Sequence, residues 1–200
     1  MPRPANPAVR RRLLDAGLAL IHANGFNGSG VKEIADAAIV PKGSFYSYFA
    51  TKDEFAVAVL EHYWAGIDRD FAIYLRDHSL PPLRRIDNFF LAMTEDNQRH
   101  DFALGCLIGN LSLEIADHSA DARAKLADVM NRWSGLLADC LREAGLDSAD
   151  LPVPDRAAVI IEAWEGAVLR GRIEQSRQPY ERFATVVLPR LLAGTAVSGA

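Results

Sequence analysis

The stretch "VPKGSFYSYFATKDEF", Val40–Phe55, packs a proline, five aromatic residues and two lysines into sixteen positions. Pro41 cannot continue a helix but starts one well, so the stretch predicts a short helix over about residues 41–49. Thr51, with Glu54 three residues later, forms a capping box that predicts the start of a long helix. This mixture of aromatic and basic side chains suits neither a core helix nor a loop.

Two further helices are predicted upstream of this stretch. An apolar stripe at helical spacing covers about residues 7–24, and Gly25 is a suitable C-terminal stop. A second, very short stripe covers about residues 31–38. Two short helices joined by a turn, the second with an exposed polar and aromatic face, have the layout of a helix-turn-helix, whose second helix enters the DNA major groove. Phe45 and Phe49 are expected to point inward and hold that helix against the two before it.

The N-terminal quarter of the chain is basic, although the whole chain is acidic. Residues 1–52 carry seven lysine or arginine side chains and three aspartate or glutamate side chains, a net charge of +4. The whole chain has a net charge of −4 at pH 7, so the remaining residues carry −8. A basic module on an acidic body indicates that the N-terminal part faces nucleic acid.

The predicted contacts with double-stranded operator DNA come from the basic, hydroxyl-bearing and glycine residues of this region. Lysines neutralise phosphates, a glycine lets the backbone approach the DNA, and serine or tyrosine hydroxyls bind phosphates or base edges. The predicted DNA-binding residues are Arg10, Lys32, Lys42, Gly43, Ser44, Tyr46, Tyr48 and Lys52. The alternative interpretation is that tyrosines and lysines on a short helix form an ordinary solvated face.

The rest of the chain is also predicted to be helical, because apolar residues recur at spacings of three and four without strand-like alternation. The long helix is predicted to run to about residue 77. Later helices are predicted over about residues 82–98, 103–117, 120–144, 154–176 and 179–193. The fold class is therefore all-α, with a three-helix helix-turn-helix DNA-binding domain over residues 1–52. A helical bundle for ligand sensing and dimerisation follows over residues 53–200.

Several function classes lack support in the sequence. No apolar run approaches the roughly 20 residues that cross a bilayer, and no signal peptide is found, so a cytoplasmic protein without a membrane partner is expected. The two cysteines are too few for a disulfide framework, and no metal, cofactor or catalytic motif occurs. Glu162 and Glu165 are interpreted as a solvated helix face. The chain is not expected to be an enzyme; a helical enzyme, or an adaptor that binds protein without DNA, is the alternative.

The segment "GFNGSGVKEIADAAIVPKGSFYSYFATKDEFAVAVLE" resembles the DNA-binding signature of TetR-family transcriptional regulators. The "KGSFYSYF" element and the lysine of "TK" are its most recognisable parts, and the resemblance covers about residues 8–61. Ile39 departs from the pattern, because many members have glycine at this position of the turn. The resemblance implies a DNA-binding regulator, most commonly a repressor.

A second resemblance concerns the sensor. "GCLIGNLSLEIAD" and "AWEGAVLRGRIEQSRQP" are similar to segments of a TetR subgroup that includes repressors answering reactive electrophiles or acrylate-type compounds. The resemblance implies that Cys106 is the sensing residue. Its place at the start of a predicted helix favours the thiolate, because the positive end of the helix dipole lies there. The other interpretation is that Cys106 is a small buried core residue, as Cys140 is expected to be.

The resemblance also implies an effector cavity among the middle helices. The residues expected to sense or bind a small-molecule effector are Cys106, Asn110, Trp64, Phe89, Met93, Trp133, Trp164 and Arg170. Each aromatic residue or methionine taken alone is more often core than cavity lining. Arg170 is included because a guanidinium binds a carboxylate or phosphate.

The last two helices are predicted to pair two copies of the chain. Ala163, Ala167 and Gly171 fall at four-residue steps and make a narrow stripe that lets another helix approach. Phe183, Val187 and Leu191 give the last helix an apolar face. Since TetR-family members pair through their last two helices, these residues are assigned to a symmetric homodimer interface; packing inside one subunit is the alternative. The chain is thus predicted to be a homodimeric repressor that a small molecule or electrophile releases from its operator.

Overall fold

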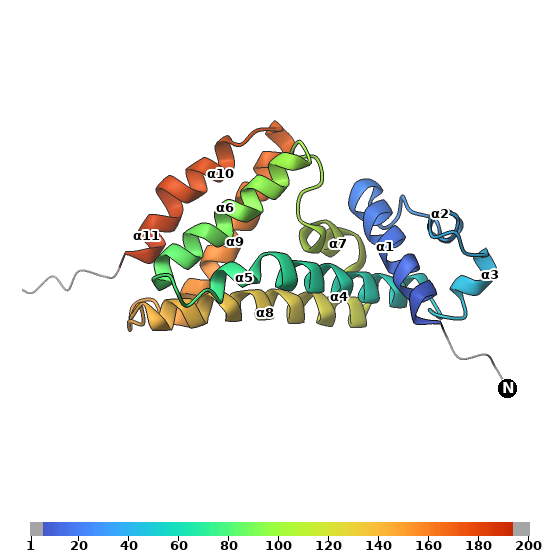
Figure 1. Ribbon diagram of the computed structural model, residues 1–200, viewed down its shortest axis with the longest axis horizontal. Coiled ribbons are helices and arrows are strands. Elements are labelled where there is room, and N and C mark those ends of the chain that lie inside the picture. The colour runs from blue at the N-terminus through green and yellow to red at the C-terminus, as the bar shows by residue number, and fades with distance from the viewer. Residues whose placement is uncertain (1–5, 194–200) are drawn as a thin grey trace, which may run out of the picture. The chain divides into compact units, whose positions relative to one another are not determined.

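The structure is a computed structural model that describes residues 6–193, and its regular elements in that range are all helical (Figure 1). The chain divides into two compact units. The first contains the chain up to Gly66 together with Leu107–Val129, and the second contains Ile67–Cys106 and the chain from Met130. The boundary predicted after residue 52 separates the DNA-binding domain from the sensing and dimerisation domain, and it stays a prediction.

The helices fall into these units as follows. The first unit holds α1 (Pro7–Asn24), α2 (Val31–Ala37), α3 (Lys42–Phe45), most of α4 (Lys52–Asp70), α7 (Leu107–Ile115) and the start of α8 (Ala120–Glu143). The second holds the remainder of α4 and α8 with α5 (Ala72–Leu75), α6 (Pro82–Arg99), α9 (Val153–Glu174), α10 (Gln178–Arg182), the π-helical η1 (Phe183–Val187) and α11 (Leu188–Leu192). No described helix is long and apolar enough to span a bilayer.

The core of the first unit is aromatic. Phe45, Phe49 and Phe55 are at most 2% exposed, and their ring centroids lie 4.9–5.6 Å apart. The inward orientation predicted for Phe45 and Phe49 is therefore confirmed. Gly17 lets α4 approach α1, because a Cβ atom there would lie 2.2 Å from Cζ of Phe55. Any larger residue at this position would displace the buried Phe55 ring.

Helix boundaries in the first unit follow their capping residues. Gly25 ends α1 as predicted, with φ 80°. The Thr51 hydroxyl accepts a hydrogen bond from the Glu54 amide at 3.0 Å, and the Glu54 carboxylate accepts one from the Ala50 amide at 2.7 Å. The predicted capping box is thus present, although its second bond reaches one residue further back. The long helix ends at Asp70, earlier than predicted, because Phe71 leaves helical geometry with φ −122°.

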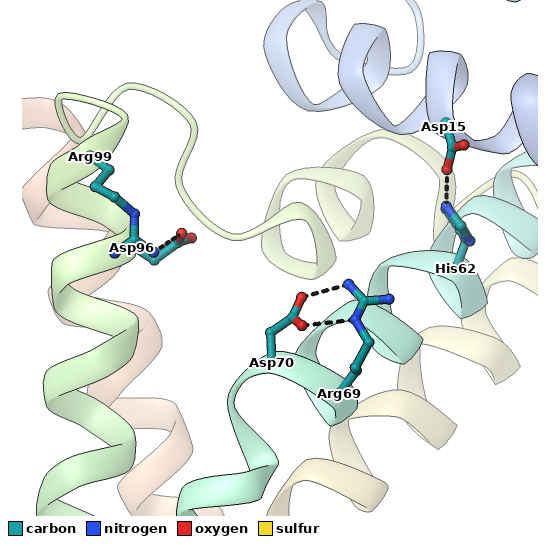
Figure 2. Close-up of polar contacts among 6 residues, drawn as sticks. All are labelled: Asp15, His62, Arg69, Asp70, Asp96 and Arg99. Atoms are coloured by element: carbon teal, nitrogen blue, oxygen red, sulfur yellow. Dashed lines mark hydrogen bonds and ion pairs between the residues drawn. The ribbon is translucent and has the colours of Figure 1, made fainter.

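Side chains on the helix surfaces form ion pairs and hydrogen bonds with one another (Figure 2). Within the first unit, Asp15 of α1 and His62 of α4 lie 2.6 Å apart between Oδ1 and Nε2. Figure 2 also shows Arg69 with its neighbour Asp70, and Arg99 with Asp96 one turn earlier on α6. Exposed pairs of this kind contribute about 0–1 kcal/mol each, so the aromatic cores outweigh them.

The second unit packs α6, α9, α10 and η1 around a cluster of large rings. Phe90, Trp164, Tyr180 and Phe183 are at most 2% exposed, and neighbouring ring centroids lie 4.9–5.4 Å apart. The helix predicted over residues 179–193 is present but contains the π-helical turn η1. Pro189 has no amide hydrogen to continue an α-helix, and the Leu188 amide bonds to the Phe183 carbonyl instead.

Candidate DNA-binding face and sensor cluster

The turn between α2 and α3 holds one exposed residue between two buried ones. Ala38 and Val40 are 3% and 7% exposed, whereas Ile39 is 81% exposed. The Val40 amide donates to the Ala35 carbonyl oxygen at 2.9 Å and closes the turn. Ile39 has φ 56°, a left-handed geometry that disfavours a β-branched side chain. The turn therefore keeps the geometry that a glycine would adopt, and Ile39 is strained in it.

The side chains of α3 divide into a buried anchor and an open face. Phe45 is fully buried, whereas Lys42, Gly43 and Tyr46 are exposed and Ser44 is half-buried. A Cβ atom added at Gly43 would meet nothing within 4 Å, and Gly43 has no positive φ. The fold therefore does not require glycine here. Because glycine has no side chain, another molecule can approach the backbone closely at Gly43.

Tyr48 and Lys52 have partners inside the chain. The Tyr48 hydroxyl accepts a hydrogen bond from the Asn6 amide at 3.1 Å, at the start of α1. Lys52 Nζ donates to the Phe26 carbonyl oxygen at 2.5 Å and lies 4.1 Å from the centroid of the Phe26 ring. Burial lowers the pKa of Lys52. Both residues thus have a structural role at helix ends, beside the DNA contacts that remain predicted for them.

Arg10 and Lys32 are the remaining predicted DNA contacts, and both are exposed. The Arg10 guanidinium lies 5.2 Å from the centroid of the Phe49 ring. Lys32 Nζ pairs with the Asp36 carboxylate at 2.7 Å, and this hydrogen bond raises the pKa of Lys32. Lys32 therefore carries its charge next to a compensating one, which weakens its attraction for a phosphate relative to Lys42.

Glu114 of α7 holds the loop that joins α1 to α2, within the first unit. Its carboxylate oxygens accept hydrogen bonds from the amides of Phe26 and Asn27 at 3.0 and 2.8 Å. Gly25 makes this possible, because a Cβ atom there would lie 2.7 Å from Oε1 of Glu114. Sequence reasoning missed this residue, since the partners are 87 and 88 positions apart and no local pattern connects them.

Cys106 lies immediately before α7 and is 7% exposed. Its place at the start of a helix agrees with the prediction, although the helix begins at Leu107 and not near residue 103. The Cys106 thiol is hydrogen-bonded to the carboxyl group of Glu165 on α9. The Oε1 atom of Glu165 is buried and has no hydrogen-bond partner within residues 6–193. This buried contact with Cys106 corrects the interpretation of Glu165 as part of a solvated face.

Tyr180 of α10 completes this group. Its hydroxyl donates to Oδ1 of Asn97 on α6 at 3.1 Å, and its ring packs against Phe102 with centroids 5.3 Å apart. A Cβ atom at Gly171 would lie 2.2 Å from the Tyr180 ring, so this glycine makes room for the tyrosine. We call Cys106, Glu165, Tyr180 and Asn97 the sensor cluster, after the sensing role that the resemblance implies for Cys106.

Burial is the main cause of the raised pKa values of Glu165 and Tyr180 in the sensor cluster. Burial raises the pKa of Glu165 to about 7, and the hydrogen bond from Cys106 only partly opposes this rise. Burial, followed by the nearby Glu165 and Cys106, raises the pKa of Tyr180. The tyrosine therefore stays protonated at neutral pH, whereas the carboxyl group exchanges its proton there.

A cavity of about 330 Å³ opens beside Tyr180 in the second unit. Its apolar lining comes from Phe90, Leu91, Tyr180 and Phe183, with Thr94 among them and Arg84, Asp87, Arg177 and Glu181 adding charge. Of the residues predicted to sense an effector, Phe89, Met93, Trp133 and Trp164 are buried in the second unit but do not line this cavity. Trp64 and Asn110 belong to the first unit.

Arg170 does not reach the buried cluster. It is exposed on α9 and forms an ion pair with Glu174 one turn later. This placement does not test whether Arg170 binds the effector, which stays a prediction. A surface pair of this type leaves the guanidinium in water, where an arginine is normally found.

The residues predicted for the dimer interface, which stays a prediction, differ in how much surface the single chain leaves open. Ala167 is 8% exposed, Phe183 is 2% exposed, and Gly171 is covered by Tyr180, so all three pack inside the chain. Ala163, Val187 and Leu191 are half-buried and keep part of their surface open. Sequence spacing identified a small-residue stripe but not the side of α9 that faces inward.

A different apolar stripe of α9 is open. Val159, Leu169 and Ile173 are 37%, 59% and 73% exposed. Gly166 lies between them on the same side, and a Cβ atom there would meet nothing within 4 Å. Because positions 159, 166 and 173 are seven residues apart, they follow one face of the helix. We call Val159, Gly166, Leu169 and Ile173 the open stripe of α9.

The sequence and the arrangement of helices are similar to those of known proteins. Residues 13–59 match the family "Bacterial regulatory proteins, tetR family", and residues 82–186 match "Transcriptional regulator LmrA/YxaF-like, C-terminal domain". The chain is 37% identical over 196 residues to the HTH-type transcriptional repressor DhaR of Mycobacterium sp. (strain GP1), covering 96% of both chains. It is 38% identical over 187 residues to the transcriptional regulator AcuR of Cereibacter sphaeroides, covering 91% of this chain and 85% of AcuR. The crystal structure of reduced Escherichia coli NemR superposes with a TM-score of 0.79 at 29% identity, covering 93% and 98% of the two chains.

Proposed function

The chain belongs to the TetR family of bacterial transcriptional regulators, and we propose that it is a homodimeric repressor released from its operator by chemistry at Cys106. The relative DhaR is a transcriptional repressor, which supports the direction of regulation. The open face of α3, on which Gly43 meets nothing of its own chain, is the observation that carries DNA binding. A recognition helix with such a face suits the major groove.

Binding to DNA is tested by fluorescence anisotropy with labelled duplexes from the region upstream of the chain's own coding sequence. Lys42→Ala should weaken binding to specific and scrambled duplexes alike, because a phosphate contact carries no sequence information. The slope of log affinity against log salt should fall by about one for each phosphate that the lysine no longer neutralises. Arg182→Ala on α10, also exposed, is the control and should leave the slope unchanged. An unchanged slope for Lys42→Ala would remove that lysine from the phosphate contacts.

Sensing at Cys106 is supported by the carboxyl group of Glu165, which is hydrogen-bonded to the Cys106 thiol. We infer that covalent modification of the sulfur changes the packing of the sensor cluster and shifts the repressor toward a form with low operator affinity. Cys106→Ser should bind the operator normally but fail to release it when an electrophile is added, since a hydroxyl is a far weaker nucleophile at neutral pH. A serine variant that releases the operator normally would exclude covalent sensing.

Dimerisation is proposed through the open stripe of α9 together with the last helical segment. Val186 is 42% exposed on that segment, so both elements offer apolar surface. Gly166 would let a second α9 approach closely. A dimer would place two recognition helices against half-sites about 34–36 Å apart, one turn of the duplex.

A further inference from the structure

Arg85 of α6 is a buried cation beside a further cavity of the second unit. Its side chain is only 3% exposed, and its Nη1 atom donates to the Leu75 carbonyl oxygen at 3.0 Å. Nη1 also lies 3.2 Å from Nδ1 of His78, which must be the acceptor because a guanidinium group only donates. The cavity has a volume of about 410 Å³ and is lined by the turn after α5, by Arg85 and by the last two turns of α8.

One edge of the Arg85 guanidinium group is only half used. The N–H bonds of Nε and Nη2 point the same way along this edge, so one carboxylate or phosphate group can accept both of them. In this chain Nη2 donates to Oε2 of Glu143, whereas Nε is buried and has no hydrogen-bond partner within residues 6–193. A buried N–H group without a partner is costly. An oxyanion with two suitably placed oxygen atoms would satisfy both bonds.

Glu143 is the anion that currently occupies this edge, and it is far less enclosed than Arg85. Its side chain is 42% exposed, and the hydrogen bond from Arg85 lowers the pKa of its carboxyl group, so it is ionised at neutral pH. Glu143 is the last residue of α8, where the helix dipole disfavours a negative charge. Glu143 can therefore turn into water, whereas the buried Arg85 would then need another counter-ion.

Two more arginines line the same cavity at its rim. The side chains of Arg76 and Arg142 are 50% and 55% exposed, and each pairs with an aspartate, Asp68 and Asp139. Exposed pairs of this kind contribute little free energy, so a ligand competes with them easily. The rim thus adds positive charge and further donors for an anion that reaches Arg85.

We propose that this cavity binds a small oxyanion, whose carboxylate or phosphate group accepts both N–H bonds of the Arg85 edge and replaces the Glu143 carboxylate there. Binding exchanges one anion for another and changes no covalent bond. The site shares no residue with the sensor cluster, and its ligand binds whether or not Cys106 is modified.

The test follows thermal unfolding of the full-length protein while chloride is replaced by phosphate, acetate or succinate at constant ionic strength. A ligand that binds only the folded chain raises its melting temperature, and the rise saturates once the site is filled. A saturable rise with phosphate alone identifies a phosphate site, and a rise with the carboxylates alone identifies a carboxylate site. No saturable rise with any of the three anions would overturn the proposal.

Glu143→Gln distinguishes a ligand site from a structural ion pair. In chloride the variant should melt at a lower temperature than wild type, because the buried Arg85 has lost its counter-ion. The bound oxyanion should restore much of this loss and bind about tenfold or more tightly than to wild type, since it no longer has to replace a charge-assisted hydrogen bond. A purely structural pair predicts the same loss of stability in every salt, and that result would overturn the proposal.

Glu181→Gln is the matched control for this variant. Glu181 lies 3.5 Å from Arg177 in a pair whose side chains are 58% and 36% exposed, so no buried cation depends on it. Its removal should leave the melting temperature in chloride and the response to each anion close to those of wild type. Restoration by the oxyanion in Glu181→Gln as well would show a general effect of the anion on the protein.

Cys140 reports the place of binding without any substitution. It is 2% exposed, lines the cavity, and donates from its thiol to the same Leu75 carbonyl oxygen, at 3.3 Å. The oxyanion should slow alkylation of Cys140 by iodoacetamide, followed by peptide mass spectrometry, and leave Cys106 unchanged. The reaction is run far below the melting temperature, so that local opening controls it.

Arg85→Lys keeps the positive charge but lacks the two parallel N–H bonds, so it should lose most of this protection of Cys140. Unchanged alkylation of Cys140 in wild type, or equal slowing of both cysteines, would place the anion elsewhere and contradict the proposed site. Protection that persists in Arg85→Lys would contradict the role of the guanidinium edge.

Discussion

Ile39 holds the turn between α2 and α3 with φ 56° and 81% of its surface exposed, so its side chain gains little from packing. The left-handed conformation costs an L-residue roughly 1–2 kcal/mol, whereas glycine avoids this cost but loses about 0.5–1 kcal/mol of unfolded-chain entropy. We therefore expect Ile39→Gly to raise the free energy of unfolding by about 1 kcal/mol, measured by urea denaturation. Ile39→Ala keeps the Cβ atom and is the control; an equal gain for alanine would show that backbone strain is not the cause.

Glu165 makes a prediction about pH and stability. Burial raises its pKa in the folded chain from 4.5 to about 7, so between these values the folded state binds a proton that the unfolded state has released. The free energy of unfolding should therefore fall as pH rises from about 4.5 to 7, by on the order of 2–3 kcal/mol from this group. Denaturation of Glu165→Gln over the same range should lack this fall, whereas Glu162→Gln should follow the wild type. Parallel curves for wild type and Glu165→Gln would contradict the raised pKa.

A substitution at Gly43 should affect stability and operator binding in opposite directions. A Cβ atom there meets nothing in the chain, so Gly43→Ala should stabilise α3 by about 0.5–1 kcal/mol through helix propensity. The same methyl group should weaken operator binding, because it would lie between the backbone and the DNA. Gly135→Ala is the matched control: Gly135 lies on α8 in equally open space and should gain stability without loss of operator affinity. Gly43→Ala with unchanged affinity, measured by anisotropy, would mean that DNA does not approach this residue.

At the scale of helices, local patterns predicted the elements well. The extents of α1, α6, α8 and α9 agree with the predictions within about two residues, because their stripes and caps are local signals. The resemblance of residues 8–61 to the TetR family is confirmed by the match over residues 13–59. The π-helical turn before Pro189 and the early end of α4 were missed, since both depend on backbone geometry at one residue.

The candidate site was harder to predict than the helices. Periodicity shows that residues share a stripe, but α9 has one apolar stripe that packs inside the chain and another that stays open. Ala167 and Gly171 belong to the first, although their small size suggested the second. Likewise, Glu162 and Glu165 are indistinguishable by spacing, although Glu162 is exposed and the carboxyl group of Glu165 contacts Cys106 from a distant segment of the chain. Contacts between distant segments leave no local pattern.

The Glu114 carboxylate accepts two hydrogen bonds from the loop after α1, which predicts that α7 holds this loop in place. Glu114→Gln removes a charge that two backbone amides share and places an amide nitrogen against one of them. Hydrogen bonds to a charged group contribute about 1.5–3 kcal/mol each, so unfolding should become easier by about 2 kcal/mol. Operator affinity should also fall, because the loop leads directly into α2. Asp117→Asn, on the exposed surface just after α7, is the control for the lost charge. Wild-type stability in Glu114→Gln would exclude this role.

At the scale of the whole molecule, chain order connects the two proposed functions. Cys106 is followed directly by Leu107, the first residue of α7, and the same helix carries Glu114. If Cys106 is the sensing residue, as proposed, we expect a change of backbone position there to reach α7 through this direct connection in the chain. We expect Glu114→Gln to retain alkylation of Cys106 but to reduce the difference in operator affinity between modified and unmodified protein.

The open stripe of α9 gives the prediction for the assembly. Ile173→Asp places a charge on a residue that is 73% exposed, so the single chain should fold normally while burial against a second copy becomes costly. The variant should be a monomer by light scattering at concentrations where wild type is a dimer. Its operator affinity should fall by about 100-fold or more, because two half-sites are no longer bound by one linked pair of recognition helices. Leu113→Asp is the matched control, since Leu113 of α7 is 87% exposed outside the stripe. A dimeric Ile173→Asp with wild-type operator affinity would place the interface elsewhere, and a monomeric Leu113→Asp would move it to α7.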